Sequence, residues 1–146
     1  MATLATRDIS DQLAATGCEV LSDPATLDFY AHDIFSRGAD LAAVVRPADK
    51  DQLAAVVKAA TDAGHAVAPR GGGMSYTGGY TQDLPGTVLV DLVKMDRILD
   101  VDQANRTVTV EPGCTWAALH DTLAPMGLRT PMWGTLSGLK ATIGGG

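Results

Sequence analysis

The segment Ala68-Pro69-Arg70-Gly71-Gly72-Gly73-Met74-Ser75-Tyr76-Thr77-Gly78-Gly79-Tyr80 contains five glycines in the nine residues 71–79, and the rest of the chain is arranged around it. Glycine loses more backbone entropy on folding than other residues and is unfavourable inside a helix or strand. The residues before it, 65–68, predict a short buried strand that Pro69 prevents from pairing further. The glycines are therefore expected at the carboxyl end of a strand.

This position predicts an anion-binding loop. In α/β proteins, ligands bind beyond the carboxyl ends of strands, and consecutive residues without a Cβ let backbone N–H groups converge on an anion. The expected anion is a phosphate, for which Ser75 supplies a hydroxyl donor. The Arg70 side chain is expected either to reach the ligand or to brace the loop. The alternative is a glycine-rich surface loop that binds nothing.

Two common phosphate motifs do not fit the loop. A dinucleotide fingerprint G-x-G-x-x-G that starts at Gly71 needs glycine at position 76, where the chain has Tyr76. A P-loop that starts at Gly73 reaches its second glycine at Gly78 but continues with glycine and tyrosine instead of lysine and serine or threonine. Neither motif is predicted.

The sequence on both sides of the loop predicts an α+β fold. An apolar strand over 41–45, an amphipathic helix from the N-cap Asp49 to Gly64, and the strand over 65–68 form a β-α-β unit. The crossover of this unit should be right-handed, and its two strands should be parallel neighbours.

Further elements are predicted before and after this unit. Two short helices precede it, one within 7–16 and one that starts at Asp23. A β-branched strand over 87–93, an antiparallel hairpin over 98–102 and 107–110, and a helix from the N-cap Thr115 to Pro125 follow it.

Composition narrows the class of protein. The chain has 146 residues, enough for one domain with a core, and its net charge of −6 makes a nucleic-acid partner unlikely on electrostatic grounds. No apolar run has the ~18 residues of a membrane span, and the amino terminus shows no apolar core of a signal peptide. The two cysteines, Cys18 and Cys114, are not spaced like the paired cysteines of metal or redox sites. We expect a cytoplasmic protein with reduced thiols. Because the sequence stops within a second glycine loop, we also expect a fragment, or a chain completed by an oligomer or another chain.

The pattern Pro-Arg-Gly-Gly-Gly-x-Ser-x-x-Gly-Gly resembles the FAD-linked oxidase family, whose flavin domain is of the vanillyl-alcohol oxidase and p-cresol methylhydroxylase type. The segments 44–47, 110–113 and 141–146 (Val-Val-Arg-Pro, Val-Glu-Pro-Gly and Ala-Thr-Ile-Gly-Gly-Gly) also fall in the order of that family. The resemblance covers roughly 20–146. It implies an amino-terminal helical segment over 1–38 and an FAD-binding domain over 39–146 that is incomplete at its carboxyl end.

The resemblance also implies which residues contact FAD. The first loop would wrap the pyrophosphate, and the small-residue segment 129–146 would form a second contact along the flavin. Gly113 would border the adenine. The implied contacts are Pro69, Arg70, Gly71, Gly72, Gly73, Met74, Ser75, Gly79, Gly113, Thr135, Ser137, Thr142 and Gly144. Met132 and Trp133 are interpreted as packing residues.

Covalent attachment of FAD is not predicted. Some members of the family link FAD through a histidine after the paired glycines, where this chain has Met74, and others add a cysteine in the later loop, where this chain has Trp133. We therefore expect FAD that dissociates.

The family implies oxidation of a hydroxy acid or alcohol by hydride transfer to the flavin, with the substrate bound through a cap domain that this chain lacks. No catalytic or metal-binding residue is assigned, because the three histidines, His32, His65 and His120, have plainer explanations. Two alternatives remain: an FAD-binding module without turnover of its own, and a phosphate binder that does not use flavin.

Overall fold

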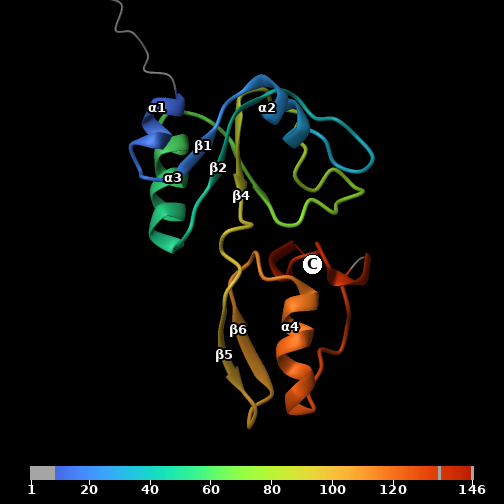
Figure 1. Ribbon diagram of the computed structural model, residues 1–146. Helices are drawn as coiled ribbons and strands as arrows, with labels where there is room; N and C mark the ends of the chain where they lie inside the picture. Colours follow the sequence, from blue (N-terminus) through green and yellow to red (C-terminus); the bar gives the residue numbers. More distant parts are fainter. Residues whose placement is uncertain (1–8, 135, 146) are drawn as a thin grey trace, which may run out of the picture.

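The computed structural model describes residues 9–134 and 136–145, and these residues form two parts that meet end to end (Figure 1). The first part is a four-stranded sheet with helices on both sides. The second is a two-stranded hairpin beside a helix, and the chain returns from that helix to the junction between the parts (Figure 1). None of the helices within the described residues is long and apolar enough to cross a membrane.

The elements largely follow the sequence predictions. The helix starts predicted at Asp23, Asp49 and Thr115 are confirmed, because each side chain accepts a hydrogen bond from a first-turn N–H. The predicted hairpin is confirmed as well. In chain order the elements are α1 (Ile9–Ala14), β1 (Glu19–Leu21), α2 (Pro24–Tyr30), β2 (Leu41–Arg46), α3 (Lys50–Asp62), β3 (Val67–Arg70), β4 (Thr87–Asp91), β5 (Ile98–Asp102), β6 (Thr107–Val110), α4 (Trp116–Leu123) and the 3-10 helices η1 (Ala124–Met126), η2 (Leu136–Gly138) and η3 (Ile143–Gly145).

The strand order β1-β2-β4-β3 corrects one prediction. Strands β2 and β3 are parallel, as expected, but they are not neighbours, because β4 lies between them and pairs with both. All five residues of β4 are buried, whereas only one residue of β3 is. A parallel strand covered on both faces needs a continuous run of buried residues, so β4 takes the centre and β3 the edge.

The role predicted for Pro69 is wrong. Strand β3 continues through it, with Pro69 opposite Val90 and Arg70 opposite Asp91. An edge strand tolerates proline because its outer side has no partner that needs the missing N–H. The glycine loop consequently begins directly after Arg70, beside the end of the central strand.

Three apolar clusters form the cores of the two parts, two in the first and one in the second. Helices α1 and α3 cover one face of the sheet around Val45 and Val88, and α2 with Tyr80 covers the other face around Leu89. In the second part, Leu119 and Leu123 of α4 pack against the hairpin. The loop 71–79 thus leaves a fixed sheet, and the last segment leaves a fixed helix.

The amino-terminal boundary stays a prediction. A helix was expected over 7–16. Residues 7 and 8 lie outside the described residues, and α1 contains the two large apolar residues of the expected helix, Ile9 and Leu13. Strand β1, which belongs to the proposed segment 1–38, pairs antiparallel with β2.

Candidate functional site

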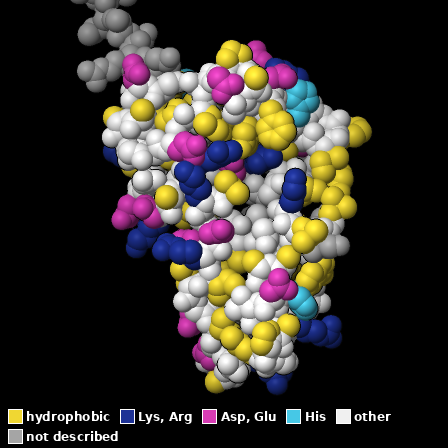
Figure 2. Space-filling view, in the orientation of Figure 1, with side chains coloured by type: hydrophobic (Ala, Val, Ile, Leu, Met, Phe, Trp, Pro, Cys, Tyr) yellow, Lys and Arg dark blue, Asp and Glu magenta, His cyan; other side chains and the backbone are white. Residues whose placement is uncertain are grey.

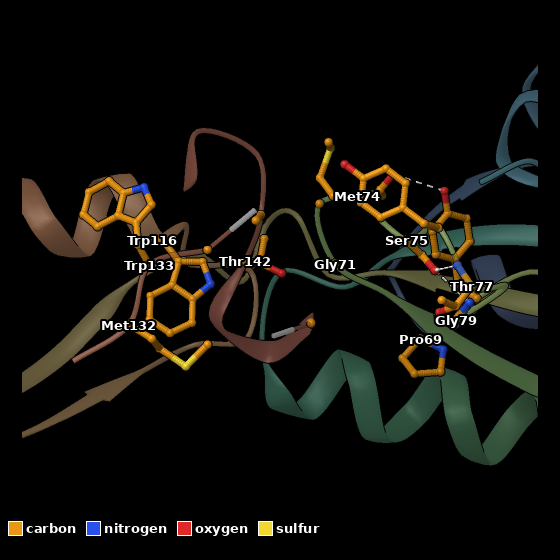
Figure 3. A pocket seen from close by; sticks show the side chains of 17 residues that line it. Pro69, Gly71, Met74, Ser75, Thr77, Gly79, Trp116, Met132, Trp133 and Thr142 are labelled. Carbon is orange, nitrogen blue, oxygen red and sulfur yellow. Dashed lines mark hydrogen bonds between the residues drawn. The ribbon is translucent and has the colours of Figure 1, made fainter. Parts of the chain in front are cut away.

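A cavity of about 480 Å³ lies between the glycine loop and the segment 132–145 (Figure 3). Its volume is in the range of small-molecule sites. Eight of the predicted contacts line it: Pro69, Gly71, Gly72, Gly73, Met74, Ser75, Gly79 and Thr142. The structure therefore brings together two segments that are about sixty positions apart in the sequence.

The backbone N–H groups of residues 71–75 donate no hydrogen bond to any described residue. Two carbonyls of the same stretch are held from behind, Gly73 O by the Tyr80 hydroxyl at 3.3 Å and Ser75 O by the Ile34 N–H at 3.2 Å. Gly73 adopts the left-handed region, with φ +70°. Consecutive free amides around a left-handed residue form an anion-binding nest.

The Ser75 hydroxyl is fixed by the loop itself. Its oxygen accepts hydrogen bonds from the Gly79 N–H at 2.9 Å and from the Thr77 N–H at 3.3 Å. A Cβ on Gly79 would lie 3.0 Å from this oxygen, so glycine permits the close approach. Because both bonds use acceptor sites, the Ser75 proton remains available to a ligand.

The later segment is tied to the start of α4. Three backbone hydrogen bonds hold it, from Trp116 N–H to Ala141 O at 3.2 Å, from Ile143 N–H to Cys114 O at 2.8 Å and from Gly144 N–H to Pro112 O at 3.0 Å. These bonds place the segment directly against the glycine loop.

Gly71 and Gly72 serve this contact between the two segments. A Cβ on Gly72 would overlap the carbonyl group of Lys140, and a Cβ on Gly71 would overlap the Thr142 hydroxyl. Glycine is thus required here by a neighbouring backbone and a neighbouring side chain. The glycines were expected to give an anion access to the backbone, and this packing role was not predicted.

Thr142 contributes a hydroxyl without a partner. The residue is 4% exposed, and no described residue bonds its Oγ1. In Figure 3 this oxygen points toward Gly71, between the two walls of the cavity. A buried polar atom without a hydrogen bond is costly, so the position suits a ligand oxygen that would accept the proton.

Met132 and Trp133 correct another interpretation. Packing roles were expected for them, but Met132 is 60% exposed and Trp133 is 44% exposed, and both line the cavity together with Trp116. The ring of His120 packs edge-on against Trp133, with centroids 4.7 Å apart, which agrees with a packing histidine. The wall opposite the nest is thus flat and apolar (Figure 3).

Of the five other predicted contacts, the three that the structure describes do not line the cavity. Arg70 lies behind the loop, and Gly113 packs under the turn at 92–95, where its N–H donates to Met95 O at 2.7 Å. Gly144 packs against Pro112. Thr135 and the side chain of Ser137 lie outside the described residues.

The cavity lining carries no charged side chain among the described residues. The other two histidines also have structural partners, His32 at the Asp28 carbonyl (2.7 Å) and His65 at the Gly86 carbonyl (2.6 Å). In the described part of the chain, no cluster of three or more His, Cys, Asp or Glu could hold a metal ion. The arrangement is suited to binding an anionic, partly flat molecule through amides and hydroxyls.

A nest at the end of a strand, facing a flat apolar wall, defines a domain that binds a nucleotide cofactor. Residues 41–146 match the family described as FAD binding domain, and the chain belongs to this family. An uncharacterised FAD-linked oxidoreductase of Mycobacterium tuberculosis is 32% identical over 129 residues, and D-2-hydroxyglutarate dehydrogenase of Xanthomonas citri is 29% identical over 127. Each alignment covers 86% of this chain and 27% of the relative, so the chain spans about a quarter of their length.

Solved structures agree with this family. The fold matches p-cresol methylhydroxylase with a TM-score of 0.76 and 21% identity, over 91% of this chain and 27% of that one. It matches glucooligosaccharide oxidase of Acremonium strictum, described with a 6-S-cysteinyl, 8α-N1-histidyl FAD, with a TM-score of 0.71 and 28% identity, over 88% and 27%. The predicted resemblance and the α+β fold class are confirmed.

Proposed function

We propose that the chain is the FAD-binding part of a flavin-dependent oxidoreductase that oxidises a hydroxy acid or an alcohol-type substrate. The observation that carries the proposal is the run of five amides for which the described residues offer no acceptor, opposite a wall whose described residues carry no charge. The name of the D-2-hydroxyglutarate dehydrogenase relative favours a hydroxy acid. When bound, FAD supplies the acceptor for a hydride from the substrate carbon.

The geometry suggests a role for each wall of the cavity. The amides of residues 71–75 and the Ser75 hydroxyl would hold the diphosphate, and the Thr142 hydroxyl would donate to an oxygen of the cofactor. Trp133 and Met132 would border a ring system. We retain Pro69 and Gly79 beside the diphosphate, and Gly113, Thr135, Ser137 and Gly144 as proposed contacts with the cofactor. Arg70, which packs behind Gly73, is proposed to brace the loop from behind.

We also propose that the chain acts as an FAD-binding domain over 39–146, in the cytoplasm, with the substrate enclosed by a cap supplied outside these residues. No catalytic base is assigned to this chain. The charge-free lining of the cavity favours one second candidate, an FAD-binding module without turnover of its own.

FAD is proposed to bind without a covalent link. Met74 and Trp133, which line the cavity, are not nucleophiles toward the flavin. Cys18 and Cys114 are free and buried, and burial raises the pKa of both thiols, which disfavours the reactive thiolate. After acid precipitation of the FAD-loaded protein, all flavin absorbance should appear in the supernatant, and flavin retained on the precipitated chain would show the proposal to be wrong.

The function is tested by titrating the protein with FAD and then adding D-2-hydroxy acids without oxygen. Saturable binding followed by loss of the 450 nm flavin band supports the oxidoreductase. Binding without bleaching supports the module. If ADP competes as well as FAD does and the purified protein shows no flavin spectrum, the site is a general phosphate binder. Lys58→Gln, which removes an exposed cation paired with Asp62 on α3, is a suitable control, because α3 does not line the cavity.

A further inference from the structure

Arg70 lies in an unusual place for a cation. Its side chain is 14% exposed, and its guanidinium is stacked between Tyr30 and Tyr80, with Cζ at 4.7 Å and 5.1 Å from the two ring centroids. No described residue accepts a hydrogen bond from it, and its buried Nε has no partner. Among the described residues its one ion pair is long, 3.9 Å from Nη1 to Oδ1 of Asp91.

The carboxylate of Asp91 is already used by other groups. Its Oδ2 accepts from the Tyr30 hydroxyl at 2.7 Å and from Arg46 Nε at 3.1 Å. Burial, together with the hydrogen bond to Asp91, raises the pKa of Tyr30, so its hydroxyl stays neutral at physiological pH. Asp91 therefore neutralises Arg46 more closely than it neutralises Arg70.

The ion pairs around Asp91 and Glu19 join more cations than carboxylates, so their formal charges do not cancel. Arg46 also approaches Glu19 at 3.6 Å, and Lys94 pairs with Glu19 at 2.8 Å. Three cations (Arg46, Arg70 and Lys94) thus face two carboxylates (Glu19 and Asp91). The longest of these ion pairs is the one between Arg70 and Asp91, so Arg70 is the least compensated of the three cations.

Two further carboxylates line the space behind the loop, but neither forms an ion pair with Arg70. Asp28 pairs with Arg37 at 3.0 Å. Asp33 accepts N–H groups from Phe35, Ser36 and Gly78 at 2.6–2.8 Å, and these backbone dipoles offset its charge. Neither carboxylate replaces Asp91 as a partner of Arg70.

The free charge lies against the nest. A Cβ on Gly73 would be 2.6 Å from Arg70 Cζ and 3.1 Å from its Nε, so the guanidinium packs directly on the backbone of Gly73. Gly73 also lines the cavity on its other side, whereas Arg70 does not. The cation is therefore separated from the cavity by one layer of backbone.

We propose that Arg70 is a positioning residue that attracts the cofactor's diphosphate from behind the loop, through its uncompensated charge and without touching the ligand. The absence of a side chain at Gly73 leaves the guanidinium unshielded from the amides that receive the anion. Because the Arg70 side chain is only 14% exposed, solvent screens its charge less than that of a cation at the surface. This inference rests on the proposed binding of FAD.

The wild-type protein alone provides a first test. Its net charge of −6 repels the FAD diphosphate, so without a local positive charge added salt should tighten binding by screening that repulsion. If the charge of Arg70 dominates at the nest, the dissociation constant of FAD should instead rise with NaCl between about 20 mM and 500 mM. A dissociation constant that falls with salt would overturn the inference.

Variants separate charge from packing. Arg70→Gln removes the charge but keeps a planar group for the two tyrosines, and it should weaken FAD binding about tenfold at low salt, with a smaller loss at high salt. Arg70→Lys keeps the charge and should remain within about threefold of wild type. Lys58→Gln, which removes an exposed cation paired with Asp62 on α3, is the matched control and should bind FAD normally.

Equal losses for Arg70→Gln and Arg70→Lys at every salt concentration would show that Arg70 acts only through packing. Normal binding by Arg70→Gln would also refute the inference, while leaving the proposed function intact. Failure of the wild type to bind FAD would instead refute the proposed function, and the inference with it. If Arg70→Gln does not fold, the sign of the wild-type salt dependence decides the question.

Discussion

Gly72→Ala is the substitution that most directly tests how the two cavity walls meet. The added Cβ would overlap the Lys140 carbonyl, and it would lie 2.6 Å from the carbonyl carbon and 3.3 Å from the Ala141 nitrogen. Ordinary van der Waals contact begins at 3.4 Å, so the segment after α4 has to retreat from the loop. Because that segment is backbone held by hydrogen bonds to Cys114 and Trp116, it cannot move as freely as a side chain.

The size of the effect follows from this geometry. Overpacking of this kind costs about 1–3 kcal/mol of folding free energy. A displaced wall would also misplace the Thr142 hydroxyl relative to the amides. A hydrogen bond to a charged group contributes about 1.5–3 kcal/mol, so losing one should raise the dissociation constant of FAD by about 10- to 100-fold.

The assay is a titration of FAD monitored by flavin fluorescence, together with thermal unfolding of each variant. Gly17→Ala is the control. Its Cβ meets no atom within 4 Å, but its φ of +78° makes alanine strained, so it should lose about 1 kcal/mol of stability and keep normal FAD affinity. If Gly72→Ala binds FAD as tightly as wild type and unfolds at the same temperature, the contact between loop and segment is not as described.

Three other predictions concern polar groups. Asp91→Asn removes the buried carboxylate that pairs with Arg46, and it should lower the free energy of unfolding by about 1.5–3 kcal/mol in urea denaturation. An unchanged free energy of unfolding would contradict a stabilising role for this carboxylate. Hydrogen bonds from Arg97 lower the pKa of Glu111, so this pair stabilises the fold above the ordinary carboxyl pKa. The stabilisation disappears as the pH falls through the lowered pKa, so the melting temperature between about pH 6 and pH 3 should fall less steeply for Glu111→Gln than for wild type. Parallel curves for the two proteins would exclude this pair as a cause of the pH dependence. Thr142→Val removes a hydroxyl that has no partner among the described residues, so the free protein should melt no lower than wild type while FAD binds about tenfold more weakly. Thr122→Val, on the exposed side of α4, is the control. Unchanged FAD affinity in Thr142→Val would show that this hydroxyl does not contact the cofactor.

Sequence reasoning worked best where one residue and its immediate neighbours decide the structure. The caps at Asp49 and Thr115 were predictable because a short polar side chain can reach only the N–H groups of the next turn. The loop was predictable because consecutive glycines have few other uses. The eight predicted contacts that line the cavity include seven from this one stretch, 69–79.

Long-range contacts were less accessible from the sequence. Nothing local to 65–70 and 87–91 shows that β4 inserts between β2 and β3, because this depends on which strand is covered on both faces. Likewise, Met132 and Trp133 resemble core residues in composition, and only their position across from the loop exposes them to the cavity. The signal that could have found them was their place in a segment without periodicity.

Three features could be predicted from local sequence: a glycine-rich loop after a strand, the starts of the helices, and the antiparallel hairpin. Each depends on the backbone preferences of neighbouring residues. Two others required the folded chain: Gly71 and Gly72 accommodate the segment around Lys140 and Thr142, and Arg70 lies behind the loop with its charge incompletely paired. These features depend on atoms brought together from distant parts of the chain, and their packing and charge balance exist only once the sheet, α4 and the returning segment are assembled.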